Sequence, residues 1–282
     1  MNMRKRILVT GAGGYIGRHV VTKLCDMGAD VSVIDFHTEG IDERAIRIDG
    51  NIFSGSSTLF HDLDKPDAVL HMAWRDGFIH NSDAHMNDLS NHYQFIHSML
   101  DSGLKQLAVM GTMHEIGYHE GAIDENTPCN PISMYGISKD ALRRSTTLLA
   151  KKYSVCLQWL RAFYILGDDK HNSSVFSKLC LAAESGKTHF PFTSGKNKYD
   201  FIRVDELATQ ISATIMQTRL DGIINCCTGN PVSLADKMEE FIREHGYSIQ
   251  LDYGVYPDRA YDSPAIWGNA TKIKKILSEY TN

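Results

Sequence analysis

Short apolar runs alternate with longer helical patterns from the N-terminus to Arg161. Each run is rich in branched side chains and too short for a helix, as expected for strands buried on both faces of a parallel sheet. The runs are Ile7–Val9, Val31–Ile34, Ala68–His71, Leu107–Met110 and Val155–Leu160. The segments between them predict helices over Tyr15–Met27, over Met86–Leu100 and over Ser133–Lys152.

This order of elements predicts an α/β fold with a doubly wound parallel sheet and right-handed crossovers. After Arg161 the rhythm becomes irregular, so we expect a smaller C-terminal α/β cap that grips a substrate over the strand ends. The expected boundaries are 1–165 for the sheet domain, with elements near 199–228 returning to it. The cap is expected to contain 166–198 and 229–282.

Composition and charge limit the classes of partner that the protein is expected to bind, but they do not change the expected fold. Hydrophobic residues make up 43% and charged residues 22%, which is ordinary globular usage. The net charge of −5 argues against a nucleic-acid partner. No apolar stretch approaches the length of a membrane span, and Ile7–Val9 is too short for the apolar core of a signal peptide. We therefore expect a cytoplasmic protein without a membrane partner.

Cysteine and histidine spacing gives no metal motif. The six cysteines form no C-x-x-C pair, and no H-E-x-x-H occurs. His80, His85, His92 and His97 share one polar segment, but their spacing matches no metal-binding pattern. We therefore expect no bound metal.

A glycine-rich loop, Thr10-Gly-Ala-Gly-Gly-Tyr-Ile-Gly17, follows the first predicted strand and opens a helix. Gly11 permits a tight turn, Gly14 lets a pyrophosphate approach the backbone, and Gly17 lets the helix pack on the sheet. The free N–H groups of the helix N-terminus then face the phosphates. This pattern predicts a dinucleotide site.

Asp35 ends the second predicted strand, at about the distance from the glycine loop that a dinucleotide site requires. A carboxylate there accepts the ribose hydroxyls of adenosine and repels a 2′-phosphate. Neither Phe36 nor His37 supplies an arginine for such a phosphate. NAD is therefore the expected cofactor.

Tyr135 and Lys139 lie four residues apart, on one face of a predicted helix. A lysine beside a tyrosine is expected to lower the pKa of the phenol, because its charge favours the phenolate. The phenolate can take a proton from a hydroxyl while hydride leaves the carbon, and the phenol can return it. Thr112, just beyond the Leu107–Met110 strand, is the expected hydroxyl partner.

Six spaced motifs resemble the extended short-chain dehydrogenase/reductases, a family of NAD-dependent nucleotide-sugar epimerases, dehydratases and reductases. They are the glycine loop, His71-Met-Ala-Trp74, Tyr135-Gly-Ile-Ser-Lys139 after Pro131, Leu160-Arg-Ala-Phe-Tyr-Ile-Leu-Gly167, Asp200-Phe-Ile-Arg-Val-Asp-Glu-Leu-Ala208 and Asn225-Cys-Cys-Thr-Gly229. The resemblance implies a Rossmann sheet and catalytic roles for Thr112, Tyr135 and Lys139, with Lys139 on the nicotinamide ribose. It also implies NAD contacts from Tyr15, Ile16, Asn51, Ile52, Met72, Ala73, Trp74 and Asn87, the segment 72–74 through its backbone.

Substrate contacts follow from the same resemblance. Arg259 matches an arginine that clasps the sugar-nucleotide diphosphate in 4-epimerases, whereas Tyr199 replaces a second one, with Arg203 nearby. Tyr164 belongs to the same expected group. The Asp-Glu pair of the 4,6-dehydratases is replaced by Met113 and His114, which disfavours dehydration. His114 is either an acid acting on a keto sugar or a wall of the pocket.

The resulting hypothesis is NAD-dependent oxidoreduction at C4 of a nucleoside-diphosphate hexose by a nucleotide-sugar 4-epimerase, with a 4-keto-6-deoxy sugar reductase as the alternative. Asp35 and Arg259 favour a 4-epimerase that retains NAD. The short chain and the missing arginine favour a 4-keto-6-deoxy sugar reductase that uses external NAD(P)H. A non-catalytic dinucleotide-binding regulator is the alternative of another class, and the intact Thr112, Tyr135 and Lys139 argue against it.

The resemblance also implies a homodimer built from two helices of each chain. An isologous contact needs apolar positions on both helices beyond those that pack on the sheet. On the first helix the apolar positions are Met86, Leu89, Tyr93, Ile96 and Leu100. On the second helix the candidate positions, which could instead face the sheet, are Leu142, Thr146, Leu149 and Tyr153.

Overall fold

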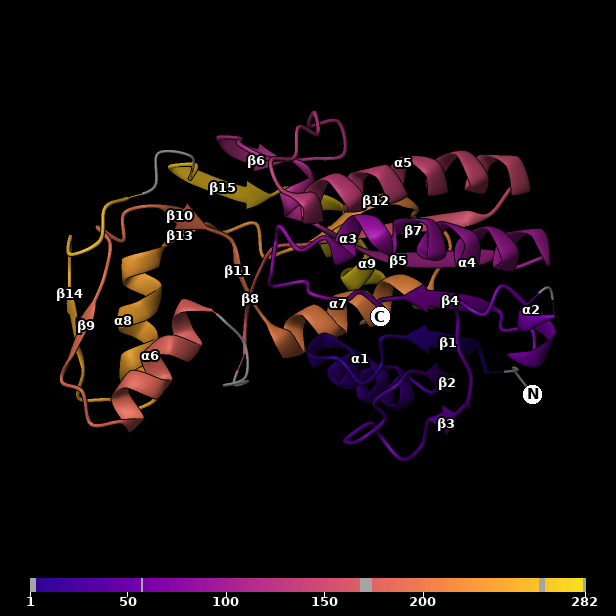
Figure 1. Cartoon of the computed structure of the whole chain (residues 1–282), viewed down its shortest axis with the longest axis horizontal. Coiled ribbons are helices and arrows are strands. Elements are labelled where there is room, and N and C mark those ends of the chain that lie inside the picture. The colour runs from indigo at the N-terminus through magenta and orange to yellow at the C-terminus, as the bar shows by residue number, and fades with distance from the viewer. Residues whose placement is uncertain (1–3, 57, 168–173, 259–261, 281–282) are drawn as a thin grey trace.

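A parallel sheet forms the larger lobe of the molecule (Figure 1). The computed structural model describes residues 4–56, 58–167, 174–258 and 262–280. Within these ranges the sheet has seven strands in the order β3-β2-β1-β4-β5-β7-β12. Their bounds are β1 Arg6–Thr10, β2 Asp30–Ile34, β3 Ile46–Arg47, β4 Ala68–His71, β5 Gln106–Thr112, β7 Cys156–Ala162 and β12 Gly222–Cys226. The predicted doubly wound sheet is confirmed.

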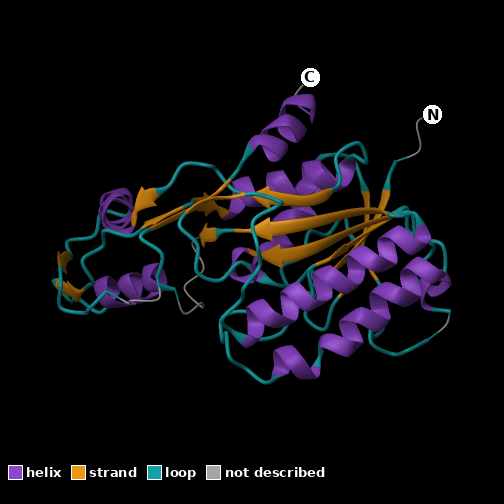
Figure 2. Ribbon diagram, turned by 90° about the horizontal axis from the view of Figure 1, so that it is seen from above, coloured by secondary structure: helices purple, strands orange, loops and turns teal. Residues whose placement is uncertain are grey.

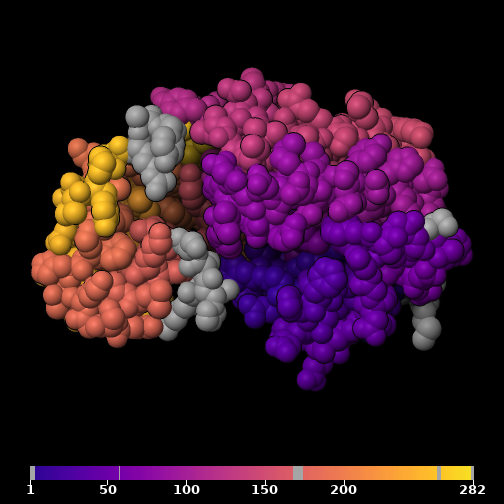
Figure 3. Space-filling view, in the orientation of Figure 1, coloured from indigo at the N-terminus to yellow at the C-terminus, as the bar shows by residue number. Residues whose placement is uncertain are grey.

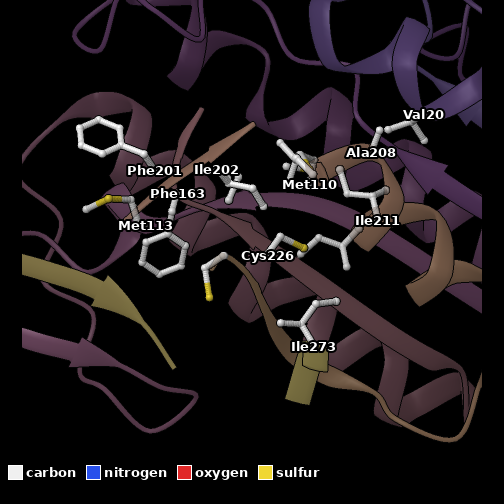
Figure 4. Packing of buried hydrophobic residues seen from close by; sticks show 14 of the residues in the cluster. Val20, Met110, Met113, Phe163, Phe201, Ile202, Ala208, Ile211, Cys226 and Ile273 are labelled. Carbon is white, nitrogen blue, oxygen red and sulfur yellow. The ribbon is translucent and has the colours of Figure 1, made fainter. Parts of the chain in front are cut away.

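Helices cover both faces of this sheet, as seen from above in Figure 2. One face carries α1 (Tyr15–Asp26), α7 (Val204–Met216) and α9 (Thr271–Tyr280), and the other carries α2 (Leu59–Asp62), α4 (Leu89–Asp101) and α5 (Met134–Tyr153). Along β1, Ile7 and Val9 point to the first face and Leu8 to the second. Figure 4 shows the first core, where Val20, Ala208, Ile211 and Ile273 from three helices pack toward the sheet.

Serine side chains cap the N-termini of helices in both lobes. The Ser133 hydroxyl accepts a hydrogen bond from the Gly136 N–H at 3.1 Å, and α5 starts at the next residue. Ser174 caps α6 (Val175–Glu184) in the same way, through the Ser177 N–H.

The smaller lobe is the cap (Figure 1). Its main sheet has the order β13-β10-β15-β6, and its helices are α6 and α8 (Leu234–Glu244). Two parallel pairs, β8 with β11 and β9 with β14, complete it. The strand bounds are β6 Gly121–Ile123, β8 Tyr164–Leu166, β9 His189–Pro191, β10 Lys198–Tyr199, β11 Phe201–Arg203, β13 Val232–Ser233, β14 Gln250–Asp252 and β15 Ala265–Gly268.

The boundary between the lobes does not follow the order of the elements along the chain. Strand β6 falls within the range 1–165 but pairs with β15 in the cap sheet. Helix α9 falls within 229–282 but buries Ile273 and Ile276 in the core shared with α7, so it covers the Rossmann sheet. Strand β12 pairs with β7 in that sheet, and α7 packs against it.

Asp200 joins the two lobes. Its buried carboxylate accepts hydrogen bonds from the backbone N–H groups of Thr228 at 2.9 Å, Gly229 at 2.9 Å and Gly268 at 3.1 Å. The first two donors directly follow β12, and the third ends β15. This explains the Asp200 and Thr228-Gly229 motifs as a structural joint between the cap and the sheet.

The buried face of α4 differs from the predicted one. The buried residues are His92, Phe95, Ile96, Met99 and Leu100. Met86, on α3 (Ala84–Asn87), and Tyr93 are exposed. The apolar stripe expected from sequence does not coincide with this buried face. The face includes a polar residue, His92, whose burial is tolerated because its ring is hydrogen-bonded to His71. On α5, Leu142, Thr146 and Leu149 are buried, so they cannot form a second, outward stripe.

Within the ranges described, no helix is long and apolar enough to cross a membrane. The same ranges contain no group of three or more histidine, cysteine, aspartate or glutamate side chains placed to hold a metal ion.

Candidate active site

The glycine loop lies at the point where the strand order of the sheet reverses, between the neighbouring carboxyl ends of β1 and β4. Gly11 has φ +72°, and a Cβ there would lie 2.5 Å from the Ala73 nitrogen. A Cβ on Gly17 would lie 2.2 Å from the Gly11 oxygen. Gly14 is exposed, and its Cβ would meet nothing closer than 3.3 Å. The loop is therefore closed toward the protein and open at Gly14, as a phosphate cradle requires.

Asp35 lies beside this loop, just after β2. Its carboxylate accepts hydrogen bonds from the Gly13 N–H at 3.0 Å and the His37 N–H at 3.1 Å. These bonds hold the acid against the glycine loop, where an adenosine ribose would lie. The open loop and the fixed carboxylate together fit NAD.

The remaining residues expected to contact NAD lie in four places. Met72, Ala73 and Trp74 follow β4. At the start of α1, the Tyr15 hydroxyl occupies the space where a Gly167 Cβ would lie, and Ile16 packs against the core. Ile52 is buried, and the exposed Asn51 accepts a hydrogen bond from the Phe53 N–H at 2.9 Å. Asn87 is exposed at the end of α3.

Thr112 and Tyr135 come together at the carboxyl end of β5. Thr112 ends this strand and Tyr135 lies in the first turn of α5. The nearby Thr112 hydroxyl favours the phenolate, but burial opposes it more strongly and raises the pKa of Tyr135 to about 12. At neutral pH the phenol is therefore protonated. The expected lowering of its pKa by Lys139 is wrong for this structure.

The reason lies in where the Lys139 ammonium is held. Its Nζ donates a hydrogen bond to the Met110 carbonyl at 2.8 Å and lies 3.9 Å from the centre of the Trp74 ring. The centre of the Tyr135 ring is 6.0 Å away. Burial lowers the pKa of Lys139 to about 7, so its charge is weakly held at neutral pH.

Glu115 is a buried residue that fixes part of this site and was not identified from the sequence. Its carboxylate accepts hydrogen bonds from the Thr112 N–H at 2.8 Å and from Trp159 Nε1 at 2.9 Å. Arg161 Nη2 lies 3.5 Å and Arg143 Nε 3.6 Å from it. Thr112 and Glu115 form a capping box, and their T-x-x-E spacing is the signal that could have revealed it.

Two imidazoles flank Tyr135. The His80 ring stacks on the phenol at 5.6 Å between ring centres, and the His114 ring lies 6.1 Å from it. Burial lowers the pKa of both histidines, that of His114 to about 4, so both are neutral at pH 7. His80 was missed as a site residue. Its signal is a polar loop at the carboxyl end of β4, the edge where ligands bind.

The space-filling view shows a recess between the cap and the sheet lobe (Figure 3). Three of the other expected substrate residues lie in cap strands, Tyr164 in β8, Tyr199 in β10 and Arg203 in β11. The rings of Tyr164 and Tyr199 pack at 4.4 Å between centres, and Tyr199 is buried. Arg203 is exposed, with its Nε 3.3 Å from Asp205. Arg259 lies outside the described residues. Of the five expected residues, the structure brings only His114 against Tyr135 within the described part of the chain.

Known proteins match this chain over most of its length. Residues 7–227 match the model of the NAD dependent epimerase/dehydratase family. The chain is 43% identical, over 267 residues, to dTDP-6-deoxy-L-talose 4-dehydrogenase (NAD(+)) of Aggregatibacter actinomycetemcomitans, covering 93% of this chain and 98% of that one. It is 25% identical to UDP-glucose 4-epimerase of Lactobacillus helveticus, covering 96% of this chain and 91% of that one.

Solved structures of other proteins have the same fold. The crystal structure of UDP-glucose 4-epimerase from Thermotoga maritima with UDP-glucose superposes with a TM-score of 0.81 at 23% identity. The alignment covers 96% of this chain and 91% of that one. UDP-N-acetylglucosamine 4-epimerase from Methanobrevibacter ruminantium gives a TM-score of 0.83 at 20% identity, over 97% and 92% of the two chains.

Proposed function

The chain belongs to the NAD dependent epimerase/dehydratase family, and we propose that it catalyses NAD-dependent oxidoreduction at C4 of a nucleoside-diphosphate hexose. We further propose that the net result is dehydrogenation or reduction. The observation that carries this is the 43% identity to a 4-dehydrogenase along nearly its whole length. The adjoining hydroxyls of Thr112 and Tyr135 supply the proton chemistry that such a reaction needs.

The acid and base of the reaction is Tyr135. In the reductive direction its protonated hydroxyl donates a proton to the C4 oxygen of a keto sugar and becomes a phenolate. In the oxidative direction the phenolate takes the proton from the C4 hydroxyl as hydride leaves C4. The Thr112 hydroxyl, close to the phenol, orients the same oxygen. NAD held along the glycine loop would supply the hydride acceptor or donor. A phenol kept neutral by burial is matched to the reductive direction.

The substrate class follows the 4-dehydrogenase relative. We propose a dTDP-linked 6-deoxyhexose, oxidised at C4 or formed by reduction of its 4-keto form. The neutral His80 and His114 rings beside Tyr135 can donate and accept hydrogen bonds with sugar hydroxyls. Met113 is buried in the core and carries no proton, which fits a reaction without the proton shuttling of a dehydratase.

A 4-epimerase is the second candidate. Its specific support is the 25% identity to a UDP-glucose 4-epimerase over 96% of the chain. Asp35, which favours NAD, is compatible with either reaction. The two candidates differ in one respect that can be measured, because an epimerase retains its reduced cofactor and returns hydride to the same sugar.

We also propose a homodimer formed through α4 and α5. These helices lie side by side in both ribbon views (Figures 1 and 2). Their outward surfaces expose Tyr93 on α4 and Ile137 and Leu148 on α5, and Leu148 is 69% exposed. Tyr93 belongs to the stripe expected from sequence, whereas Ile137 and Leu148 replace the expected positions on α5 as the apolar positions of a twofold contact.

The test of the proposed function uses NADH absorbance at 340 nm. The purified protein is incubated with NAD and a panel of dTDP-6-deoxyhexoses, with UDP-hexoses as the contrasting set. The proposal expects NADH to accumulate in step with a 4-keto product for a dTDP-6-deoxyhexose. Conversion of UDP-glucose to UDP-galactose without added cofactor, and without NADH, would instead support the epimerase.

A further inference from the structure

Trp74 places an aromatic ring directly against the Lys139 ammonium. The Nζ atom lies 3.9 Å from the ring centre, well within the range of a cation–π contact. The sequence analysis expected only the backbone of residues 72–74 to matter, through contact with NAD. The indole side chain therefore has a role still to be explained.

The indole is fixed from two sides. Its Nε1 donates a hydrogen bond to His85 Nδ1 at 3.0 Å, and His85 Nε2 donates in turn to the Ile79 carbonyl at 3.0 Å. The His92 ring stacks on the indole at 4.5 Å with 19° between the planes. Both neighbours hold the ring in one orientation, and His85 also ties it to the loop that carries His80.

The His92 contact reaches back to the glycine loop. His92 Nδ1 and His71 Nε2 share a hydrogen bond at 2.9 Å, and His71 Nδ1 and the Thr10 hydroxyl share one at 2.8 Å. Thr10 immediately precedes Gly11. An unbroken chain of contacts thus connects the start of the cofactor loop, through two buried imidazoles and the indole, to Lys139.

Lys139 needs such a support because it is buried at 3% exposure. Its ammonium has three donors, and the Met110 carbonyl accepts one of them. The electron-rich face of an indole attracts a cation in a site with little water. Without the ring, the long lysine side chain could leave this position through its four rotatable bonds.

We propose that Trp74 is a positioning residue: its indole face holds the Lys139 ammonium in the place from which Lys139 serves the cofactor and Tyr135. This inference rests on the proposed function for the role of Lys139 in turnover. The contact itself does not depend on that function, so the two can be tested apart.

The first test lowers the electron density of the Trp74 indole ring in steps without changing the shape of the ring. Tryptophans carrying one to three fluorine atoms are incorporated at position 74 alone, since fluorine weakens the cation–π attraction in steps. We expect kcat/KM and the affinity for NAD to fall stepwise, by roughly tenfold in total. The same analogues at Trp267, in cap strand β15, are the control and leave both values unchanged. A flat response at position 74 would overturn the proposal.

The second test needs no turnover. In protein carrying ¹³C-labelled lysine, the ε-methylene signal of Lys139, assigned by its loss in Lys139→Arg, is expected upfield because of the indole ring current. Trp74→Leu should abolish this shift, and Trp74→Phe should retain part of it together with most of the NAD affinity. A Lys139 signal at the ordinary position in the wild type contradicts the contact.

The two tests separate the claims. If no nucleotide sugar is turned over but the ring-current shift is present and NAD affinity follows the fluorine series, the proposed function fails and the positioning role stands. If sugars are turned over but the series is flat, the positioning role fails alone. Circular dichroism of each variant verifies the fold, and the fluorinated proteins supply the answer if Trp74→Leu does not fold.

Discussion

Tyr135 is the residue on which the chemistry of the proposed site depends. Its phenol is half-buried, protonated at neutral pH and close to the Thr112 hydroxyl. Tyr135→Phe removes only the hydroxyl, so we expect kcat to fall by about 10²–10⁴. The dissociation constant for NAD, measured by fluorescence titration, should stay within about threefold, because the phenyl ring keeps its packing.

The exposed Tyr256 provides a matched control for that substitution. Tyr256→Phe should leave kcat unchanged. Full activity in Tyr135→Phe, with Tyr256→Phe also active, would remove Tyr135 from the mechanism.

Lys139 makes stability depend on pH in a direction set by its pKa. Burial lowers that pKa from 10.5 to about 7, so between these values the unfolded chain binds the proton more tightly than the folded one. The free energy of unfolding should therefore rise with pH, by about 2 kcal/mol from pH 7 to pH 9. Lys139→Met should lose this rise in urea denaturation of the cofactor-free protein.

Lys187, an exposed lysine in the cap, provides the comparison. Lys187→Met is expected to retain the full rise. An identical pH dependence in the wild type and in Lys139→Met would show that Lys139 keeps an ordinary pKa.

Among the elements, those that pack by repeated periodicity were predictable. The strands β1, β2, β4, β5 and β7 were each identified within about two residues, because buried parallel strands are continuous apolar runs. The catalytic triplet and the glycine loop were predictable because each motif lies at a strand end or in a helix turn that the same patterns locate. Their roles remain predictions to be tested by substitution.

The elements that were not predicted depend on partners distant in sequence rather than on a local pattern. Strands such as β6 and β10 are only two or three residues long, and their partners are far away in the chain, so no local period exists. The buried face of α4 was misjudged because His92 satisfies its polarity through His71. Glu115 and His80 were missed for the same reason, since their roles are defined by partners distant in sequence.

Glu115 also determines how β5 and α5 meet. It is fully buried between Arg161 and Arg143 and fixes the backbone of Thr112. Glu115→Ala leaves the buried Arg161 guanidinium without its carboxylate, so we expect a loss of about 3–5 kcal/mol in the free energy of unfolding. Denaturant unfolding checks this value.

The exposed Glu120 provides the control, and Glu120→Ala should stay within about 0.5 kcal/mol of the wild type. A loss below about 1 kcal/mol in Glu115→Ala would mean that the ion pairs around Glu115 contribute little to the junction.

At the scale of the whole molecule, two lobes meet across the strand ends, and α4 and α5 face away from the cap (Figure 1). The proposed dimer uses this outer surface. We expect light scattering to give twice the 31.6 kDa of one chain, and Leu148→Glu to shift the mass toward the monomer by burying a charge in the contact.

Leu181 on the cap helix α6 is 55% exposed and provides the matched control, because Leu181→Glu should leave the dimer intact. A wild-type mass of one chain throughout the micromolar range would contradict the dimer.

The central claim, net hydride transfer between C4 of the sugar and NAD, is tested most directly with deuterium. A dTDP-6-deoxyhexose carrying deuterium at C4 is incubated with the protein and NAD, and the products are separated and examined by mass spectrometry. The account predicts that the label leaves the sugar and appears in released NADH, one deuterium for each 4-keto sugar formed. Deuterium retained at C4 of an epimerised sugar, with no labelled NADH, would contradict it.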